Sequence, residues 1–367
     1  MKRFISVLLL TSIIFNLTAC SLKTEPERYQ AQFLELFDTV TTIIGYAESK
    51  EEFSEFSQSV YDNLKEYHEL FDIYHNYEGI NNVKTINDNA GIAPVKVDQR
   101  IIELLQFAKE AYTLSEGKVN VAFGAVLSVW HDYREEGLNT PDRAKLPPME
   151  LLKEKAKHTD MNQIIVDEKA STVYLTDPEM RLDVGAIAKG YATEQVARIA
   201  MADGYTNALF SVGGNVRSIG SKGPDIREKA DTSTSKKVVA WKVGVQNPDL
   251  ESDEPYLDIL ELDNLSLVSS GDYERYYTVD GKRYHHIINP DTLMPTTYYR
   301  AVSIVTEDSG LADALSTAIF NLPYEEGLKL IESLPDTEAL WVYTDGTLKP
   351  SSGFEALLNK SDSGTTD

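Results

Sequence analysis

The chain has 367 residues, of which 58 are acidic and 35 are Lys or Arg, so its formal net charge at pH 7 is −23. Apolar residues make up 42% of the sequence, which excludes a disordered or fibrous protein and allows a substantial buried core. The acidity argues against nucleic acid as a partner, because phosphate binding requires clustered Lys and Arg. An acidic enzyme that acts on a phosphorylated ligand needs a local cation instead, and a bound divalent metal is one way to supply it.

The N-terminus has the pattern of a secretory signal. Two basic residues precede a mostly apolar stretch, Phe4–Phe15, which is too short to span a bilayer. The sequence LTAC that follows resembles a bacterial lipobox and ends at Cys20, the only cysteine of the chain. We therefore expect residues 1–19 to be a lipoprotein signal peptide and Cys20 to be lipidated. Residues 20–30 would form a tether that holds the protein on the extracytoplasmic face of the cell membrane. The alternative is a free cysteine at the end of an ordinary signal peptide.

Residues 31–358 are expected to form a single α+β domain, in which largely antiparallel sheets pack against a few helices. Apolar residues at helical spacing predict helices over these ranges: Phe53–Phe71, Ile101–Ser115, Val184–Ala202, Leu311–Asn321, and a short one in Pro141–Lys157. Clusters of β-branched and aromatic residues predict strands over these: Phe33–Tyr46, Ile164–Val166, Thr172–Thr176, Ala208–Val212, Val238–Val245, Leu257–Leu262, Ser266–Ser270, Tyr284–Ile288 and Ala301–Val305. The charged segment Gly223–Lys237 is expected to be an exposed excursion, and residues 359–367 a flexible tail.

The first candidate site segment is Arg181–Tyr191, RLDVGAIAKGY. An acid, Asp183, stands between an expected strand and an expected helix that carries Lys189. Backbone N–H groups at a helix N-terminus favour anions, and Lys189 would add a positive charge. The segment thus predicts an anion site, but an equally good interpretation is that Asp183 only caps the helix while the glycines serve packing.

The second segment is Ser211–Arg217, SVGGNVR, where a strand meets a Gly-Gly-Asn turn. Two adjacent glycines allow the backbone to approach a ligand closely. The same turn is typical of an ordinary hairpin, which is the favoured interpretation.

The third segment is Tyr284–Pro295, YHHIINPDTLMP, which contains the adjacent histidines His285 and His286. Side chains alternate along a strand, so only one of the two faces a given site, and a zinc centre is poorly supported. A lone histidine on a strand is more often structural than catalytic, and Asn289–Thr292 is expected to form a turn.

The fourth segment is Thr306–Phe320, TEDSGLADALSTAIF, in which Asp313 and Thr317 lie four residues apart on one face of the expected helix. A carboxylate one turn from a hydroxyl suits an oxygen-only site for Mg²⁺. From the residues alone, an ordinary i,i+4 pair on a solvated face is the more common arrangement.

Taken together and in this order, the four segments and Leu267–Tyr277 (LVSSGDYERYY) resemble the ApbE family of FAD:protein FMN transferases. The resemblance spans roughly Phe33–Leu348 and implies an ApbE (T-fold-like) catalytic domain. It further implies a Mg²⁺-dependent reaction in which FAD is cleaved at its pyrophosphate. FMN is joined by a phosphoester to a Thr or Ser hydroxyl of an acceptor protein, and AMP is released. The acceptor would be an extracytoplasmic or membrane-bound protein with an FMN-binding domain.

The resemblance also implies roles for individual residues. The side chains of Asp313 and Thr317 and the main-chain carbonyl of Ala186 would bind Mg²⁺. The residues that would contact the flavin nucleotide are Phe37, Tyr74, Lys118, Val119, Asn120, Asp183, Lys189, His286 and Ile287.

The sequence departs from the family pattern at three places. Phe37 and Asp38 stand where the family commonly has Met-Gly, Asn120 stands where an Asp is usual, and Ala122 where a Thr is usual. We expect these substitutions to alter the polar contacts in the nucleotide pocket.

Phosphoryl transfer depends on positioning and on neutralising the equatorial oxygens, which Mg²⁺ on Asp313 and Thr317, with Lys189 nearby, would achieve. The acceptor hydroxyl must also lose a proton. His286 is a hypothetical general base, because an unperturbed histidine titrates near pH 6.5. The alternatives are a Mg²⁺-dependent FAD pyrophosphatase, in which water replaces the acceptor, and a non-catalytic FAD-binding lipoprotein. The Asp313/Thr317 pair favours an enzyme.

Overall fold

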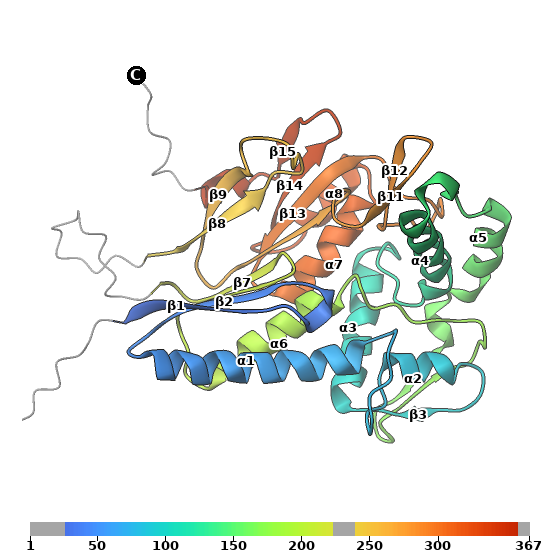
Figure 1. The fold of residues 1–367 in the computed structure, drawn as a ribbon, viewed down its shortest axis with the longest axis horizontal. Coiled ribbons are helices and arrows are strands. Elements are labelled where there is room, and N and C mark those ends of the chain that lie inside the picture. The colour runs from blue at the N-terminus through green and yellow to red at the C-terminus, as the bar shows by residue number, and fades with distance from the viewer. Residues whose placement is uncertain (1–25, 223–238, 359–367) are drawn as a thin grey trace, which may run out of the picture.

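The computed structural model describes residues 26–222 and 239–358. Its centre is an eight-stranded antiparallel sheet with the strand order β1-β2-β6-β7-β10-β13-β14-β15 (Figure 1). The strands are β1 (Glu27–Phe33), β2 (Thr41–Ala47), β6 (Ala208–Val212), β7 (Asn215–Ile219), β10 (Ser266–Gly271), β13 (Tyr299–Thr306), β14 (Glu338–Tyr343) and β15 (Leu348–Pro350). The pairing of β7 with β10 joins strands that lie far apart in the sequence. The predicted α+β class with antiparallel sheets is confirmed.

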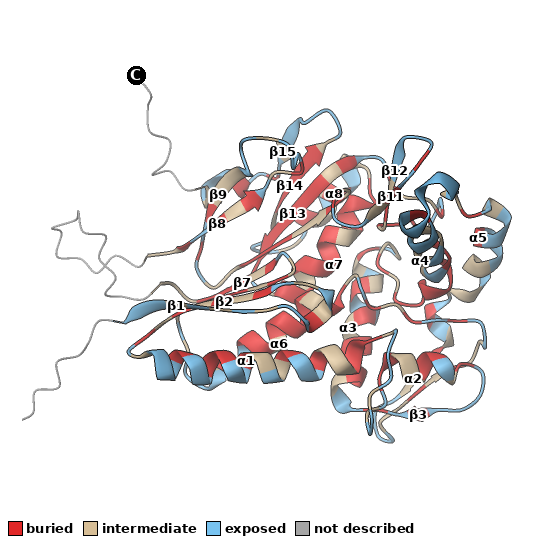
Figure 2. Ribbon diagram, in the orientation of Figure 1, coloured by how far each residue is buried: buried red, intermediate tan, exposed pale blue. Residues whose placement is uncertain are grey.

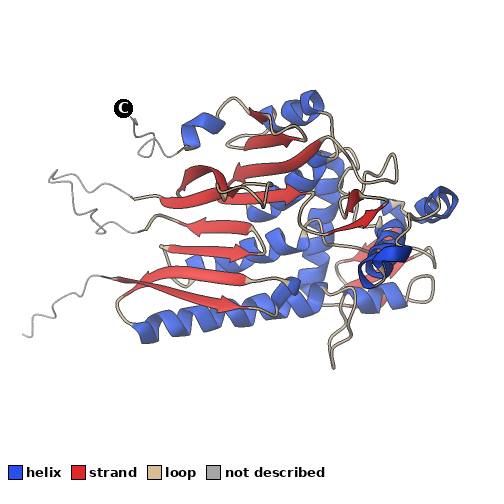
Figure 3. Ribbon diagram, turned by 45° about the horizontal axis from the view of Figure 1, so that its top comes forward, coloured by secondary structure: helices blue, strands red, loops and turns tan. Residues whose placement is uncertain are grey.

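One face of this sheet is covered by helices, which Figure 3 shows gathered behind the strands. The helices are α1 (Lys50–Phe71), α6 (Ala188–Ala202), α7 (Ser309–Phe320) and α8 (Tyr324–Glu332). Strand side chains alternate between the two faces. Ile43 of β2 is fully buried in the same core cluster as the apolar residues of α1, whereas Ile44 packs against the cluster on the other face. Val302 of β13 likewise packs in the cluster that contains the apolar residues of α7.

The opposite face is covered by a hairpin of β8 (Trp241–Gln246) and β9 (Tyr256–Leu262). Because both faces are covered, the central strands are buried on both sides, as the continuous buried run of β13 shows (Figure 2). The structured C-terminal end packs here as well, since Phe354 lies in the same core cluster as Trp241.

A second group of elements flanks one end of the large sheet (Figure 1). It contains α4 (Gly124–Asn139), α5 (Met149–Lys155) and the hairpin of β11 (Tyr276–Val279) and β12 (Lys282–His285), which share a core cluster of their own. Below them lie α2 (Val83–Asp88), α3 (Gln99–Leu114) and a small sheet ordered β3-β5-β4, formed by Val95–Lys96, Thr172–Leu175 and Ile164–Asp167. The expected hairpin of Ile164–Val166 with Thr172–Thr176 is therefore confirmed.

Four expected elements are wrong in part. The range Phe33–Tyr46, expected to be a single strand, instead contains the last residue of β1, a 3₁₀ turn at Leu36–Asp38 and most of β2, which pairs antiparallel with β1. Phe37 and Asp38 adopt left-handed backbone conformations, with φ of 53° and 52°, which no strand accommodates. The expected tether over residues 20–30 is too long, because β1 begins at Glu27 and its first residues already pair with β2.

The other two corrections concern where elements begin and end. The helix expected from Val184 begins at Ala188, because Gly185–Ile187 form a turn before it. The strand expected over Tyr284–Ile288 ends at His285. Cys20, the signal peptide, Gly223–Lys237 and the tail over 359–367 lie outside the described residues. Among the helices of the described residues, none is both long and apolar enough to cross a bilayer.

Candidate functional site

A cavity of about 520 Å³ opens where the flanking group meets one end of the large sheet. The end of β10 and the turn between β6 and β7 contribute to its wall, together with α4, the start of α6 and the middle of α7. Every described residue that the sequence assigned to the flavin nucleotide or to Mg²⁺ lines this one cavity. They are Phe37, Tyr74, Lys118, Val119, Asn120, Asp183, Ala186, Lys189, His286, Ile287, Asp313 and Thr317.

The close crossing of α6 and α7 brings the carboxylate of Asp313 to the start of α6. The backbone N–H of Gly190 donates to Asp313 Oδ2 at 2.8 Å. A Cβ atom added to Gly190 would stand 2.3 Å from the carbonyl oxygen of Ser309 and 2.4 Å from Asp313 Cβ, so only glycine allows this approach. Asp313 is buried, which raises the pKa of its carboxyl, while the positive charge of Lys189 acts in the opposite direction. The alternative of a solvated helix face for Asp313 is therefore wrong.

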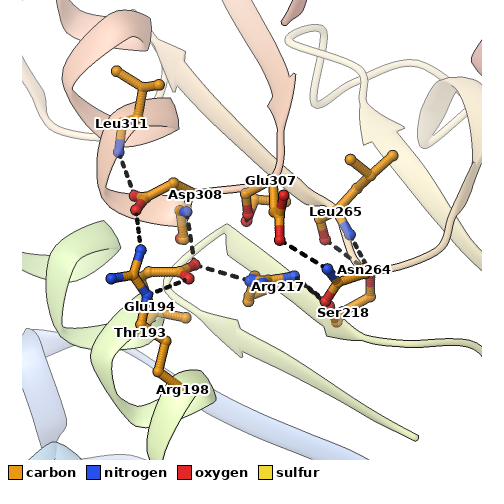
Figure 4. Close-up of polar contacts among 12 residues, drawn as sticks. Thr193, Glu194, Arg198, Arg217, Ser218, Asn264, Leu265, Glu307, Asp308 and Leu311 are labelled. Atoms are coloured by element: carbon orange, nitrogen blue, oxygen red, sulfur yellow. Dashed lines mark hydrogen bonds and ion pairs between the residues drawn. The ribbon is translucent and has the colours of Figure 1, made fainter. Parts of the chain in front are cut away.

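A buried ion-pair network fixes this crossing from behind (Figure 4). Glu194 of α6 accepts from Arg217 Nε of β7 at 2.9 Å, and the same oxygen accepts from the backbone N–H of Ser309 at the start of α7 at 3.0 Å. Arg198 bridges the other oxygen of Glu194, at 3.0 Å, to Asp308 at 2.7 Å. Glu194 and Arg217 are both almost fully buried. The arginine of the SVGGNVR segment thus holds α6, α7 and β7 together rather than lining the cavity.

The turn before α6 is held by Asp183, whose Oδ1 accepts from the backbone N–H of Gly185 at 2.9 Å. Asp183 does not cap the helix, because the residue preceding the first turn is Ile187 and no side chain caps it. Burial raises the pKa of the Asp183 carboxyl. Of the two interpretations of this segment, the helix cap is wrong, and the turn faces the cavity.

The Gly-Gly-Asn turn is the expected hairpin between β6 and β7. Gly213 and Gly214 have φ of 56° and 90°, which side chains rarely adopt. Gly213 and Asn215 also line the cavity, so the same turn serves as part of its wall.

The two adjacent histidines have different environments. His285 is buried in the protein, where its Nε2 contacts the carbonyl oxygen of Thr296 at 2.8 Å, and it does not line the cavity. His286 lines the cavity, and its buried Nδ1 has no hydrogen-bond partner in the described part of the chain. Burial, followed by the charges of Arg275 and Arg134 among its neighbours, lowers the pKa of His286 to about 3. The expectation that His286 titrates near pH 6.5 is therefore wrong for the free protein.

A chain of hydrogen bonds connects the two aromatic residues expected over the ligand. The N–H of Phe37 donates to His68 Nδ1 at 3.2 Å, and His68 Nε2 lies 3.4 Å from the hydroxyl of Tyr77. That hydroxyl donates to Asp72 Oδ2 at 2.8 Å, and Asp72 Oδ1 accepts from the backbone N–H of Tyr74 at 2.6 Å. The left-handed backbone at Phe37 is thus held by a partner from α1, and Tyr74 stands half exposed beside the same cavity.

Asn120, one of the departures from the family pattern, and its neighbour Lys118 both bind other residues of the protein. Asn120 Oδ1 accepts from the N–H of Ala122 at 2.8 Å, and its Nδ2 donates to the carbonyl oxygen of Thr159 at 2.9 Å. Lys118 forms an ion pair with Asp291, which follows the expected Asn-Pro turn. The polar groups of Lys118 and Asn120 are therefore already engaged before any ligand is bound.

The sequence interpretation missed α4 and, with it, the cavity-lining His131 and Arg134. It also missed Arg275, although this residue lies in the LVSSGDYERYY segment. The signal for α4 was present in the i, i+3 and i+4 spacing of Val126, Val129 and Trp130, all of which are buried.

This α+β domain has one cavity whose wall contains a buried carboxylate, a lysine and a neutral imidazole, which are groups expected in an enzyme active site. The chain belongs to the ApbE family, whose profile matches residues 37–341. It is 36% identical over 275 residues to the FAD:protein FMN transferase of Treponema pallidum, a match that covers 73% of this chain and 72% of that protein. It is 29% identical over 306 residues to the FAD:protein FMN transferase of Klebsiella pneumoniae, covering 83% and 87% of the two chains.

The solved structures agree on the fold. The ApbE protein of Thermotoga maritima superposes with a TM-score of 0.76 at 27% identity and covers 91% of this chain and 100% of its own. The flavin transferase ApbE of Vibrio cholerae gives a TM-score of 0.72 with the same coverages, and at 22% identity it speaks for the fold alone. The expected ApbE architecture is confirmed.

Proposed function

We propose that this protein is an FAD:protein FMN transferase, which cleaves FAD at its pyrophosphate and joins FMN to a Thr or Ser hydroxyl of an acceptor protein, with release of AMP. The observation that carries the proposal is the convergence of Asp183, Lys189, His286, Asp313 and Thr317, from three separate segments, on one cavity. Relatives at 36% and 29% identity that bear this name support it.

We propose that the reaction depends on Mg²⁺, held by the side chains of Asp313 and Thr317 and the main-chain carbonyl of Ala186. All three donors are oxygens, and a buried carboxylate beside a hydroxyl suits a hard cation. Among residues 26–222 and 239–358, no three His, Cys, Asp or Glu side chains are grouped to hold a metal, so a site here takes its remaining ligands from water and substrate phosphates. When bound, Mg²⁺ neutralises charge on the phosphate oxygens.

His286 remains the proposed base for the acceptor hydroxyl, on a different argument from the one the sequence offered. It is neutral in the free protein and its Nδ1 has no partner among the described residues, so it is able to accept a proton. Burial is the largest cause of the low pKa of His286, and nearby positive charges add to it. A bound pyrophosphate would offset those charges and shift this pKa upward, which would strengthen the base when substrate is present.

We propose that the protein works on the extracytoplasmic face of the cell membrane, anchored through lipid on Cys20. The lipobox-like sequence before this cysteine supports the proposal. The acceptor would then be an extracytoplasmic or membrane-bound protein with an FMN-binding domain.

The test is incubation of the protein, expressed without residues 1–20, with FAD, Mg²⁺ and a candidate acceptor domain. The intact mass of the acceptor and the free AMP and FMN are followed with and without EDTA. A metal-dependent gain of one FMN on the acceptor, with AMP released, supports the transferase. Metal-dependent AMP together with free FMN and an unmodified acceptor favours the pyrophosphatase. Bound FAD without cleavage favours a flavin-binding lipoprotein.

A further inference from the structure

Two arginines that the proposed reaction has not yet used line the same cavity. Arg134 lies on α4, and Arg275 lies in the connection between β10 and β11. We propose that Arg134 and Arg275 together form a subsite for a phosphate group of a flavin dinucleotide or of the adenylate that leaves it. The identity of the nucleotide rests on the proposed function, whereas the affinity for phosphate does not.

The first observation is that, among the residues that the structure describes, neither guanidinium forms an ion pair with a carboxylate. Within the described part of the chain, Arg134 makes one side-chain hydrogen bond, between its Nη2 and His131 Nδ1 at 2.9 Å. A neutral imidazole carries no negative charge, so this contact does not neutralise the guanidinium. Arg275 is itself exposed and makes no hydrogen bond or ion pair with any described residue, and its exposed neighbour Glu274 does not pair with it. Lys118, in the wall of the same cavity, does have a carboxylate partner in Asp291.

The second observation is that both side chains line one cavity and that the charge of Arg275 acts on Arg134. Burial lowers the pKa of the Arg134 guanidinium, and Arg275 lowers it further. Tyr74, Asp183 and Glu135 act in the opposite direction, but Asp183 forms its hydrogen bond with the backbone of Gly185, and Glu135 forms no ion pair with Arg134. Two like charges brought together at a partly buried site are unfavourable until an anion lies between them.

The chemistry of the side chains favours phosphate over other anions. A guanidinium offers a planar pair of donors that matches two phosphate oxygens, and it stays charged at any physiological pH. Lys189 and Asp313 lie at the crossing of α6 and α7, whereas the arginines come from α4 and from the β10–β11 connection. The positive charges of Lys189, Arg134 and Arg275 all act on His286, so the cavity offers cations from separate elements around one imidazole. A ligand that carries more than one phosphate group, or a product that carries a phosphate group of its own, matches that arrangement.

The experiment compares ligands with and without phosphate in EDTA, so that no metal contributes. FAD and riboflavin are titrated by flavin fluorescence, and AMP and inorganic pyrophosphate by calorimetry. The variants are Arg134→Gln, Arg275→Gln and their double substitution. Arg143→Gln is the matched control, because Arg143 is exposed and does not line the cavity. The melting temperature of each variant checks that it is folded.

Each single substitution is expected to weaken FAD binding about 10-fold or more, because it removes a charge-assisted hydrogen bond to a phosphate. Riboflavin has no phosphate, so its binding is expected to stay unchanged. Arg275→Lys, which keeps the charge without the planar pair of donors, is expected to lose less. An FAD affinity that stays within twofold of the wild type, or an equal loss for riboflavin, overturns the subsite. A weaker affinity for AMP assigns the subsite to the adenylate, and an unchanged one assigns it to the flavin-side phosphate.

The same data separate this proposal from the proposed function. If the wild type binds pyrophosphate and the double variant does not, the subsite stands even when no FMN transfer is found. If the wild type transfers FMN while the double variant binds FAD and pyrophosphate normally, the function stands and the subsite is overturned.

Discussion

Acidification should destabilise the protein through His286. In the free protein, burial and then the nearby charge of Arg275 lower the pKa of this imidazole from 6.5 to about 3. In the unfolded chain the same group titrates at its ordinary value. Between these two values the unfolded state binds a proton that the native state excludes, so stability that is present above pH 6.5 is lost progressively as the pH falls toward 3.

The size of the effect follows from the two pKa values. One pKa unit corresponds to about 1.4 kcal/mol of difference between the protonation states. A pH of 5 is 1.5 units below the ordinary pKa of 6.5, so the histidine is almost fully protonated in the unfolded chain, whereas in the native protein it is neutral. The folded state should therefore lose about 2 kcal/mol through this group alone between pH 7.5 and pH 5.

Urea unfolding of metal-free protein at pH 7.5 and pH 5, for the wild type and for His286→Gln, measures this contribution. Burial raises the pKa values of Asp183 and Asp313, which gives a pH dependence of the opposite sign, but those groups are present in both proteins. The wild type should thus lose about 2 kcal/mol more than the variant over this range. Equal losses in the two proteins would mean that the fold does not hold His286 neutral, and the reasoning about the base would be wrong.

Three further predictions concern the crossing of α6 and α7. Gly190→Ala should lower the free energy of unfolding by about 1–3 kcal/mol in urea, because the added Cβ meets Ser309 and Asp313 at under 2.5 Å; a neutral effect would mean that the helices separate easily. Glu194→Ala should cost about 3–5 kcal/mol, measured in the same way, because it leaves Arg217 buried without its carboxylate. Asp313→Ala should abolish Mg²⁺-dependent AMP release while the melting temperature is kept or raised, since a buried carboxylate is removed; retained metal-dependent turnover would contradict the metal assignment.

Local patterns were sufficient for the class of the fold and for the residues around Asp313. The four-residue spacing of Asp313 and Thr317 needs only one helical turn to place both on one face, and both do line the cavity. Turn chemistry likewise predicted the hairpin at Gly213 and Gly214. In each case the information lies within a few residues of the sequence.

The features that were missed depend on contacts between distant segments. The low pKa of His286 arises first from burial and then mainly from Arg275, with smaller effects of His285, Arg134 and Lys189; burial and the three cations depend on other elements, so the sequence around the histidine does not predict it. The left-handed backbone of Phe37 is held by His68, 31 residues away. The strand that was expected there has the right composition, but the hydrogen bond from α1 favours a turn.

The wall of the cavity runs from Phe37 near the start of the domain to Thr317 near its end, and the sheet that supports it joins β7 to β10 and β2 to β6. No short fragment of the chain therefore contains the whole binding surface. Such non-local pairing is typical of slowly folding topologies, and the cavity is complete only when these distant segments have come together. A ligand that recognises only the finished cavity adds its binding free energy to the global stability. The nucleotide would thus stabilise only the completely folded protein, and a truncated or partly folded chain would not be stabilised by it.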